Sequence, residues 1–142
     1  MTPTEIWDFL TEGTRTGHAA TTRADGRPHV APVWFVLDGT PEVFTVLFST
    51  SAGTVKGRNL ERDPRISFCV DDPHPNYSFV LIDGSVEIID DLVQVRELAT
   101  RCGARYVGPD RAEEYGARNG VEGELGVRLT PSRVIGIRDL AD

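Results

Sequence analysis

The sequence predicts a mainly β fold, a small antiparallel barrel of six strands with short helices between them. Three observations predict it. Several runs are rich in β-branched and aromatic residues, their connections are as short as hairpin turns, and the helical segments are too few to alternate with strands as βαβ units do. The chain has 142 residues, about the length of one domain, so we expect a single domain over residues 1–142.

The first expected element is a short helix near the N-terminus. Thr2 can cap this helix, and Pro3 suits its first turn. Apolar residues between positions 6 and 10 recur at the i, i+3, i+4 spacing of one helix face, and Gly13 follows the pattern as a stop.

Strands are expected next. Residues 17–22 and 29–38 form two strand-like runs around Asp25 and Gly26, a strong hairpin signal because glycine tolerates a positive φ. A third run over residues 42–49 follows closely and is rich in valine and phenylalanine.

The second half of the chain continues this pattern after a short helix over residues 52–62, which must end before Pro64. We expect Pro131 to break or bend the last strand, because proline donates no hydrogen bond to a sheet. The remaining elements are expected in this order: strand 65–70, strand 77–90, helix 91–101, short helix 109–116 and strand 125–137.

Composition excludes several classes of protein. The net charge of −7 argues against nucleic acid as the main partner. No apolar run approaches the roughly 20 residues of a membrane span, and no secretory signal pattern opens the chain, so we expect a cytoplasmic protein without membrane contact. Cys69 and Cys102 lack the spacing of a metal site or a disulfide framework, and the three histidines are scattered. We therefore expect no metal site.

The stretch from Ser49 to Pro64 (STSAGTVKGRNLERDP) holds the only lysine of a chain with fourteen arginines. A helix that begins here offers unpaired N–H groups and a partial positive charge to an anion. Hydroxyl groups, Gly53, Lys56 and Arg58 would complete a site for a single phosphate. The same residues also fit an ordinary helix cap followed by a solvated helix face. The spacing differs from that of a nucleoside triphosphate loop.

Three segments, residues 17–36, 49–66 and 77–91, resemble the pyridoxamine-phosphate-oxidase-like flavin and deazaflavin reductases. The similarity is greatest to the actinobacterial branch that uses the deazaflavin coenzyme F420. It covers about residues 5 to 138, and K-x-R-N-L-x-R-D-P is its most specific element. The resemblance implies a split β-barrel of the FMN-binding type. It also implies a homodimer that holds the cofactor in a groove between its subunits.

The resemblance also implies which residues bind the cofactor. Lys56 occupies the position of the lysine that binds the phosphate of the ribityl tail. Thr54 stands where some deazaflavin-binding relatives carry arginine, which leaves FMN open as the cofactor. Asn59 could equally serve as a structural hydrogen-bonding group. The implied phosphate pocket comprises Ser49, Thr50, Thr54, Lys56, Gly57, Arg58 and Asn59.

The implied ring site is the segment Pro32, Val33, Trp34 and Phe35. A proline inside a strand indicates an edge, a bulge or a segment that faces a ligand. Strand alternation places the side chains of Val33 and Phe35 on one face and that of Trp34 on the other, and each could equally be core.

Tyr77 and Phe79 correspond to aromatic residues that border the substrate pocket in the related proteins. Both could instead pack in the barrel or at a subunit interface.

The expected function is therefore that of an oxidoreductase that transfers a hydride from reduced F420 to a small unsaturated acceptor, such as an enone, a quinone or a tetrapyrrole-like molecule. In such a site the cofactor carries the chemistry, so no catalytic residue is assigned. Two alternatives remain: an FMN-dependent oxidoreductase on the same fold, and a non-catalytic protein that binds F420 or haem.

Overall fold

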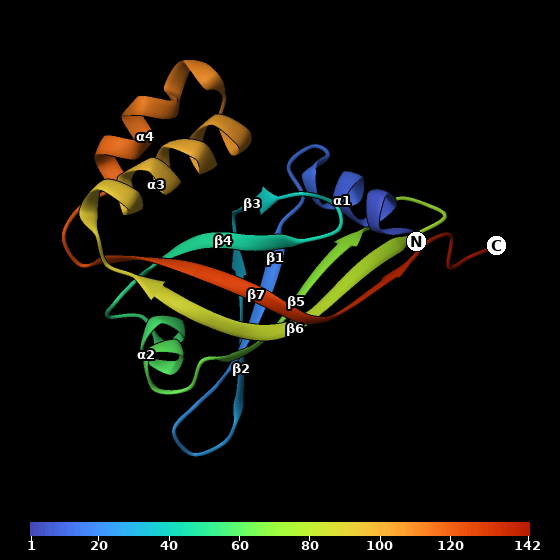
Figure 1. The fold of residues 1–142 in the computed structure, drawn as a ribbon, viewed down its shortest axis with the longest axis horizontal. Coiled ribbons are helices and arrows are strands. Elements are labelled where there is room, and N and C mark those ends of the chain that lie inside the picture. The colour runs from blue at the N-terminus through green and yellow to red at the C-terminus, as the bar shows by residue number, and fades with distance from the viewer.

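The computed structural model describes residues 1–142 as one curled antiparallel sheet of seven strands surrounded by short helices (Figure 1). The strand order is β2-β1-β5-β6-β7-β4-β3. The elements are α1 Pro3–Thr11, β1 Gly17–Thr22, β2 Pro28–Val33, β3 Phe35–Gly39, β4 Phe44–Ser51, α2 Val55–Arg62, β5 Arg65–Asp72, β6 Ser78–Ile89, α3 Leu92–Tyr106, the 3-10 turn η1 Pro109–Arg111, α4 Ala112–Asn119 and β7 Glu124–Ile137.

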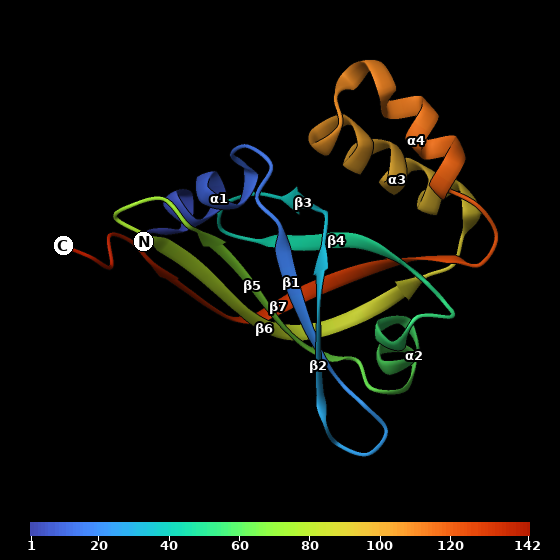
Figure 2. The ribbon, with the colours of Figure 1, turned by 180° about the vertical axis from the view of Figure 1, so that it is seen from behind.

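The predicted mainly β architecture is confirmed, with one strand more than the six expected. The run predicted as a single strand over residues 29–38 is two strands, β2 and β3, separated by Trp34. β2 pairs with β1 and β3 pairs with β4, so these two strands form opposite edges of the sheet. Because one residue joins the two edges, the sheet has to curl into a barrel (Figure 2).

The core fills the inside of this barrel. Phe35, Phe48 and Phe68 are fully buried, and the rings of Phe35 and Phe68 meet edge to face with centroids 5.3 Å apart. Gly17 in β1 lies directly over the ring of Phe68, where a Cβ atom would collide. Leu10 from α1 is also fully buried, so this helix closes one end of the core.

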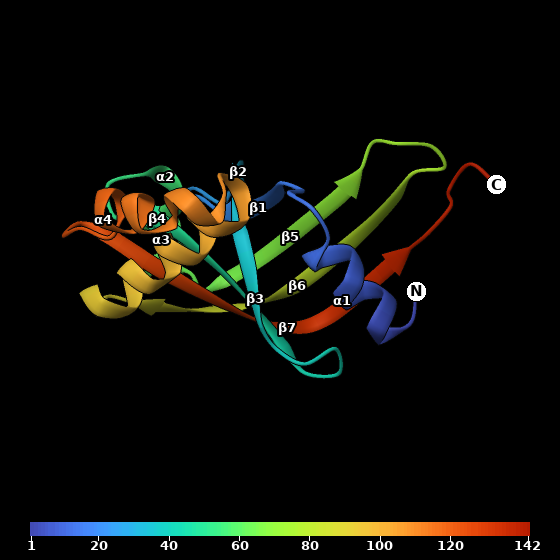
Figure 3. The same cartoon turned by 90° about the horizontal axis from the view of Figure 1, so that it is seen from above.

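The N-terminal helix agrees with its sequence prediction. Thr2 caps α1 by accepting a hydrogen bond from the N–H group of Glu5, at 3.2 Å. The Glu5 carboxylate accepts one from the N–H group of Thr2 in return, at 2.7 Å. α1 and the α3–α4 pair lie toward opposite ends of the barrel (Figure 3).

The last strand bends but does not break. β7 runs from Glu124 to Ile137. Asp83 pairs with Arg133 and Gly84 with Pro131, so Ser132 has no partner in β6 and forms a β-bulge. β7 pairs with β4 only up to Leu129, so the missing N–H group of Pro131 costs no bond on that side.

The helices α3 and α4 follow β6 and precede β7 in the sequence, and they pack against each other. α3 extends to Tyr106, beyond the predicted end at residue 101, and α4 follows a 3-10 turn. The two helices can approach because Gly103 has no side chain, and an added Cβ atom there would lie 2.7 Å from the Cβ atom of Tyr115. No helix in the structure has both the length and the apolar character needed to cross a membrane.

Candidate functional site

A cavity of about 390 Å³ lies between the barrel and the α3–α4 pair. Pockets of this size class hold small ligands. Its walls come from β2, β4, α2, α3 and α4. The lining residues are Thr16, Pro32, Val33, Trp34, Ser49, Lys56, Ala99, Cys102, Gly103, Tyr115 and Asn119.

Lys56 is the only charged side chain in this lining. It lies in the first turn of α2 and is half-buried. Burial lowers the pKa of its ammonium group below the ordinary value, and the nearby carboxylate of Glu124 opposes that shift. No protein group forms a hydrogen bond or ion pair with the ammonium, so its charge lacks a direct partner within the chain.

The start of α2 explains how Lys56 reaches the cavity. The helix begins at Val55, later than the predicted residue 52, because Thr54 is its N-cap and accepts a hydrogen bond from the N–H group of Gly57 at 3.0 Å. The hydroxyl of Thr54 also lies 3.0 Å from that of Thr50. A Cβ atom on Gly57 would collide with the carbonyl oxygen of Ser51. Thr50, Thr54 and Gly57 thus build the cap and do not line the cavity.

Arg58 and Asn59 also lie outside the lining. The Arg58 guanidinium donates to the carbonyl oxygen of Gly53 at 2.9 Å and is exposed. Asn59 is buried, and its amide donates to the hydroxyl of Thr21 at 3.0 Å and accepts from Arg62 at 3.3 Å. The bond to Thr21 holds α2 against β1, so Asn59 has the structural hydrogen-bonding role that was one of its two predicted roles. Contact of Arg58 or Asn59 with a cofactor remains a prediction.

The corner between β2 and β3 forms the second wall. Pro32 is exposed on the edge strand β2, one of the positions that its sequence context indicates. Val33 and Phe35 are buried while the indole of Trp34 is 45% exposed, as strand alternation predicts. Phe35 belongs to the barrel core, so only the first three residues of the predicted ring site line the cavity.

The third wall comes from α3 and α4, and sequence reasoning missed it. Ala99, Cys102 and Gly103 have the i, i+3, i+4 spacing of one helix face, which could have indicated a small-residue wall. Burial raises the pKa of the Cys102 thiol to about 11, so this group stays protonated at neutral pH and is no thiolate nucleophile. Tyr115 and Asn119 complete the wall from α4.

Tyr77 and Phe79 lie elsewhere in the chain. The start of β6 is near the chain termini, away from α3 and α4 (Figure 1). Tyr77 is 45% exposed, and Phe79 pairs with Ile137 at the end of β7. The structure therefore does not bring these two aromatic residues to the cavity of their own chain.

The similarity to known proteins extends over nearly the whole chain. A family model described as pyridoxamine 5'-phosphate oxidase matches residues 3–137. The fold is similar to that of the conserved hypothetical protein Rv2991 from Mycobacterium tuberculosis, with 28% identity, a TM-score of 0.83 and coverage of 100% of this chain and 89% of that chain.

Two further solved structures are informative. An F420 reductase is 27% identical, with a TM-score of 0.70 over 90% of this chain and 94% of its own. The heme storage protein HutZ from Vibrio cholerae is 22% identical, with a TM-score of 0.68 over 95% of this chain and 94% of its own. The second likeness shows the fold alone.

Proposed function

The chain belongs to the pyridoxamine 5'-phosphate oxidase family, and from this premise we propose that it is an oxidoreductase that binds coenzyme F420. The proposed reaction is hydride transfer from the reduced deazaflavin to an unsaturated organic acceptor, such as an enone, a quinone or a tetrapyrrole-like molecule. One observation carries the proposal. Lys56 lines the cavity, and its half-buried ammonium forms no hydrogen bond or ion pair with another protein group. A bound phosphate would supply the missing negative charge.

The residues present fit a phosphorylated ring cofactor. Lys56 would bind a phosphate oxygen, the cap of α2 leaves first-turn N–H groups for the same anion, and Ser49 adds a hydroxyl at this end of the cavity. Val33 and Trp34 would cover the apolar ring and exclude water from it. The likeness to an F420 reductase supports the deazaflavin as that ring.

The chemistry of the lining agrees with a reaction carried by a cofactor. When bound, the deazaflavin supplies the hydride. The lining contains no carboxylate and no imidazole, and its thiol stays protonated, so it holds no carboxylate or imidazole base and no thiolate nucleophile. Their part would be to bind, orient and shield the reactants.

FMN is the second candidate cofactor. It also presents one phosphate, and it lacks the anionic oligoglutamate tail of F420. Thr54 stands where an arginine would strengthen the grip on a more anionic cofactor, and its hydroxyl is already used in the helix cap. None of the three histidines lines the cavity, so a haem bound there would lack the histidine ligand that holds the iron in many haem proteins.

We also propose that the protein acts as a homodimer. The outer sheet face, defined here by Val30, Pro32, Cys69, Leu81 and Ile135, points away from the core along neighbouring strands. Two large apolar side chains of this face are exposed to solvent, Val30 at 65% and Leu81 at 40%. Such a face suits a second copy of the chain. The partner copy would also have to supply Tyr77 and Phe79 if they border the acceptor.

A fluorescence titration of the purified protein with F420 and with FMN tests this function. Replacing Lys56 by alanine should weaken cofactor binding by about 1 to 3 kcal/mol, because a charge-assisted bond to phosphate is lost. The matched control is Arg27→Ala, which removes one positive charge from the exposed turn between β1 and β2 and should leave affinity unchanged. Equal affinity of Lys56→Ala and the parent would remove Lys56 from the site.

The same titration separates the candidates. Binding of F420 followed by turnover with a panel of unsaturated acceptors supports the main proposal. Tight FMN retention without F420 binding would replace it by the FMN-dependent enzyme. Binding of F420 without turnover of any acceptor would instead indicate a carrier.

A further inference from the structure

Trp34 lines the cavity but belongs to neither β2 nor β3, so strand pairing does not fix the orientation of its side chain. It lies at the junction where the chain leaves one sheet edge and enters the other, and its indole is 45% exposed. A side chain at such a junction has few strand neighbours to fix its rotamer. The last turn of α3 provides the contacts that the sheet lacks.

Tyr106 makes two kinds of contact with this junction. Its ring stacks on the indole of Trp34 with centroids 5.0 Å apart and planes within 1° of parallel. Its hydroxyl accepts a hydrogen bond from the N–H group of Phe35 at 3.2 Å and donates one to the carbonyl oxygen of Arg15 at 2.8 Å. The phenol ring therefore touches the wall, while the hydroxyl fixes the backbone beside it.

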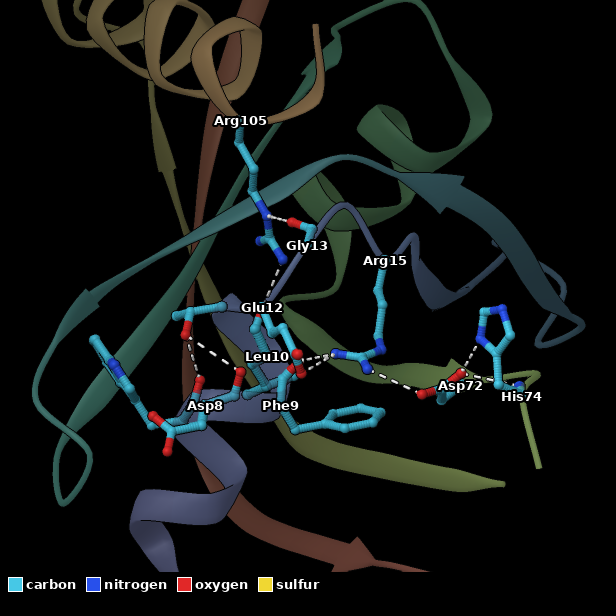
Figure 4. Close-up of polar contacts among 11 residues, drawn as sticks. Asp8, Phe9, Leu10, Glu12, Gly13, Arg15, Asp72, His74 and Arg105 are labelled. Carbon is cyan, nitrogen blue, oxygen red and sulfur yellow. Dashed lines mark hydrogen bonds and ion pairs between the residues drawn. The ribbon is translucent and has the colours of Figure 1, made fainter. Parts of the chain in front are cut away.

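Arg105 ties the same turn to three backbone segments. Its guanidinium donates to the carbonyl oxygens of Leu10 at 2.7 Å and Gly13 at 3.0 Å (Figure 4). It also donates to the carbonyl oxygen of Phe35 at 2.8 Å. These carbonyls belong to β3, to α1 and to the loop after α1. A planar guanidinium can serve several acceptors at once, which an ammonium could not do in the same geometry.

The loop that receives these bonds is itself anchored. Arg15 forms an ion pair with Asp72 at 3.0 Å, and the side chain of His74 lies 2.7 Å from the same carboxylate (Figure 4). The backbone and side-chain bonds from His74 and the Arg15 guanidinium hold the pKa of Asp72 well below its usual range. The loop that accepts bonds from Arg105 and Tyr106 is thus held to β5 through Asp72.

From these contacts we infer that Tyr106 and Arg105 are positioning residues for the cavity. Tyr106 holds the indole of Trp34 flat as a preformed wall, and Arg105 fixes the backbone on which that wall stands. The ring ligand that uses the wall rests on the proposed function, but the order of Trp34 does not. Preforming the wall favours binding because no side chain has to be ordered when the ligand enters.

The first test reads the order of Trp34 in the apoprotein. The chain has two tryptophans, so Trp7→Phe leaves Trp34 as the sole emitter. In that background, Tyr106→Leu should raise acrylamide quenching about twofold, because a side chain now 45% exposed becomes free to turn into solvent. Gln94→Leu is the control, since Gln94 is an exposed residue of α3 outside the cavity lining, and it should leave quenching unchanged. Unchanged quenching in Tyr106→Leu would overturn the inference.

A milder variant guards against loss of folding. Tyr106→Phe keeps the ring and removes only the hydroxyl, so the N–H group of Phe35 loses its acceptor. Exchange of this amide with solvent deuterium, followed by NMR, should accelerate about tenfold. An unaltered exchange rate would overturn the role of the hydroxyl.

The link to binding is tested with the parent and Tyr106→Leu side by side. Affinity for F420 or FMN should fall about 2- to 10-fold when the wall has to be ordered by the ligand. Normal affinity despite a mobile Trp34 would overturn the role of the wall in binding. If the parent bound neither cofactor, the proposed function would fail, while the quenching result would still decide whether Tyr106 orders Trp34.

Discussion

Two polar residues of one motif have opposite surroundings. Lys56 and Asn59 lie three positions apart on α2, yet the Lys56 ammonium faces a cavity without a partner and the Asn59 amide is buried with its bonds made. A charged group without a partner is available to a ligand, whereas a satisfied amide stabilises the fold. The motif therefore combines a candidate binding residue with a structural one.

Replacing Asn59 by alanine should lower the free energy of unfolding by about 1 to 3 kcal/mol, because the buried hydroxyl of Thr21 loses its partner. Urea denaturation of the apoprotein measures this loss. In a double-mutant cycle with Thr21→Val, the two costs should sum to more than that of the double variant. Strict additivity would show that the two side chains do not interact.

Two residues that carried a distinct signal in the sequence lie in the cavity lining, and their contact with a cofactor stays a prediction. The uniqueness of Lys56 and the strand position of Pro32 both indicated groups that line the cavity. Tyr115 and Asn119 carried no such signal, because their place depends on how α4 packs on α3. The predicted helix ended at residue 101, so Cys102, Arg105 and Tyr106 were never assigned to its face.

Among the elements, α1 shows most directly how sequence sets a boundary. Thr2 and Glu5 exchange two hydrogen bonds across its first turn. Replacing Thr2 by alanine should cost about 0.5 to 2 kcal/mol of stability, because the N–H group of Glu5 loses its acceptor. The control is Thr4→Ala, at an exposed position in the first turn of α1. It should leave stability unchanged or raise it slightly, because alanine has the higher helix propensity. Equal stability of the two variants, measured by urea denaturation, would contradict the cap.

Strands and helices were predictable wherever local composition decides them. The hairpin turn at Asp25 and Gly26, the cap at Thr2 and the stop before Pro64 all depend on neighbouring residues. The division of one predicted strand into β2 and β3 does not, since the residues on both sides of the break, Val33 and Phe35, are apolar. The break separates a half that pairs with β1 from a half that pairs with β4, and such long-range pairing cannot be read from a local pattern.

For the whole molecule, the proposed dimer is the property most open to experiment. Light scattering after gel filtration should give twice the chain mass of 15.6 kDa. Leu81→Glu places a charge in the middle of the outer sheet face and should convert the dimer to a monomer. Val43→Glu, at a residue that is 77% exposed before β4, is the control and should stay dimeric. A monomeric parent would refute the dimer.

The junction at Trp34 also limits how the chain length can vary. A single residue spans from one sheet edge to the other, so an insertion there would let β2 and β3 drift apart and open the barrel. The turn between β1 and β2 carries no such restriction, because both of its ends belong to one hairpin. Homologous chains should therefore differ in length at residues 23–27 while keeping a constant spacing across residues 33–35.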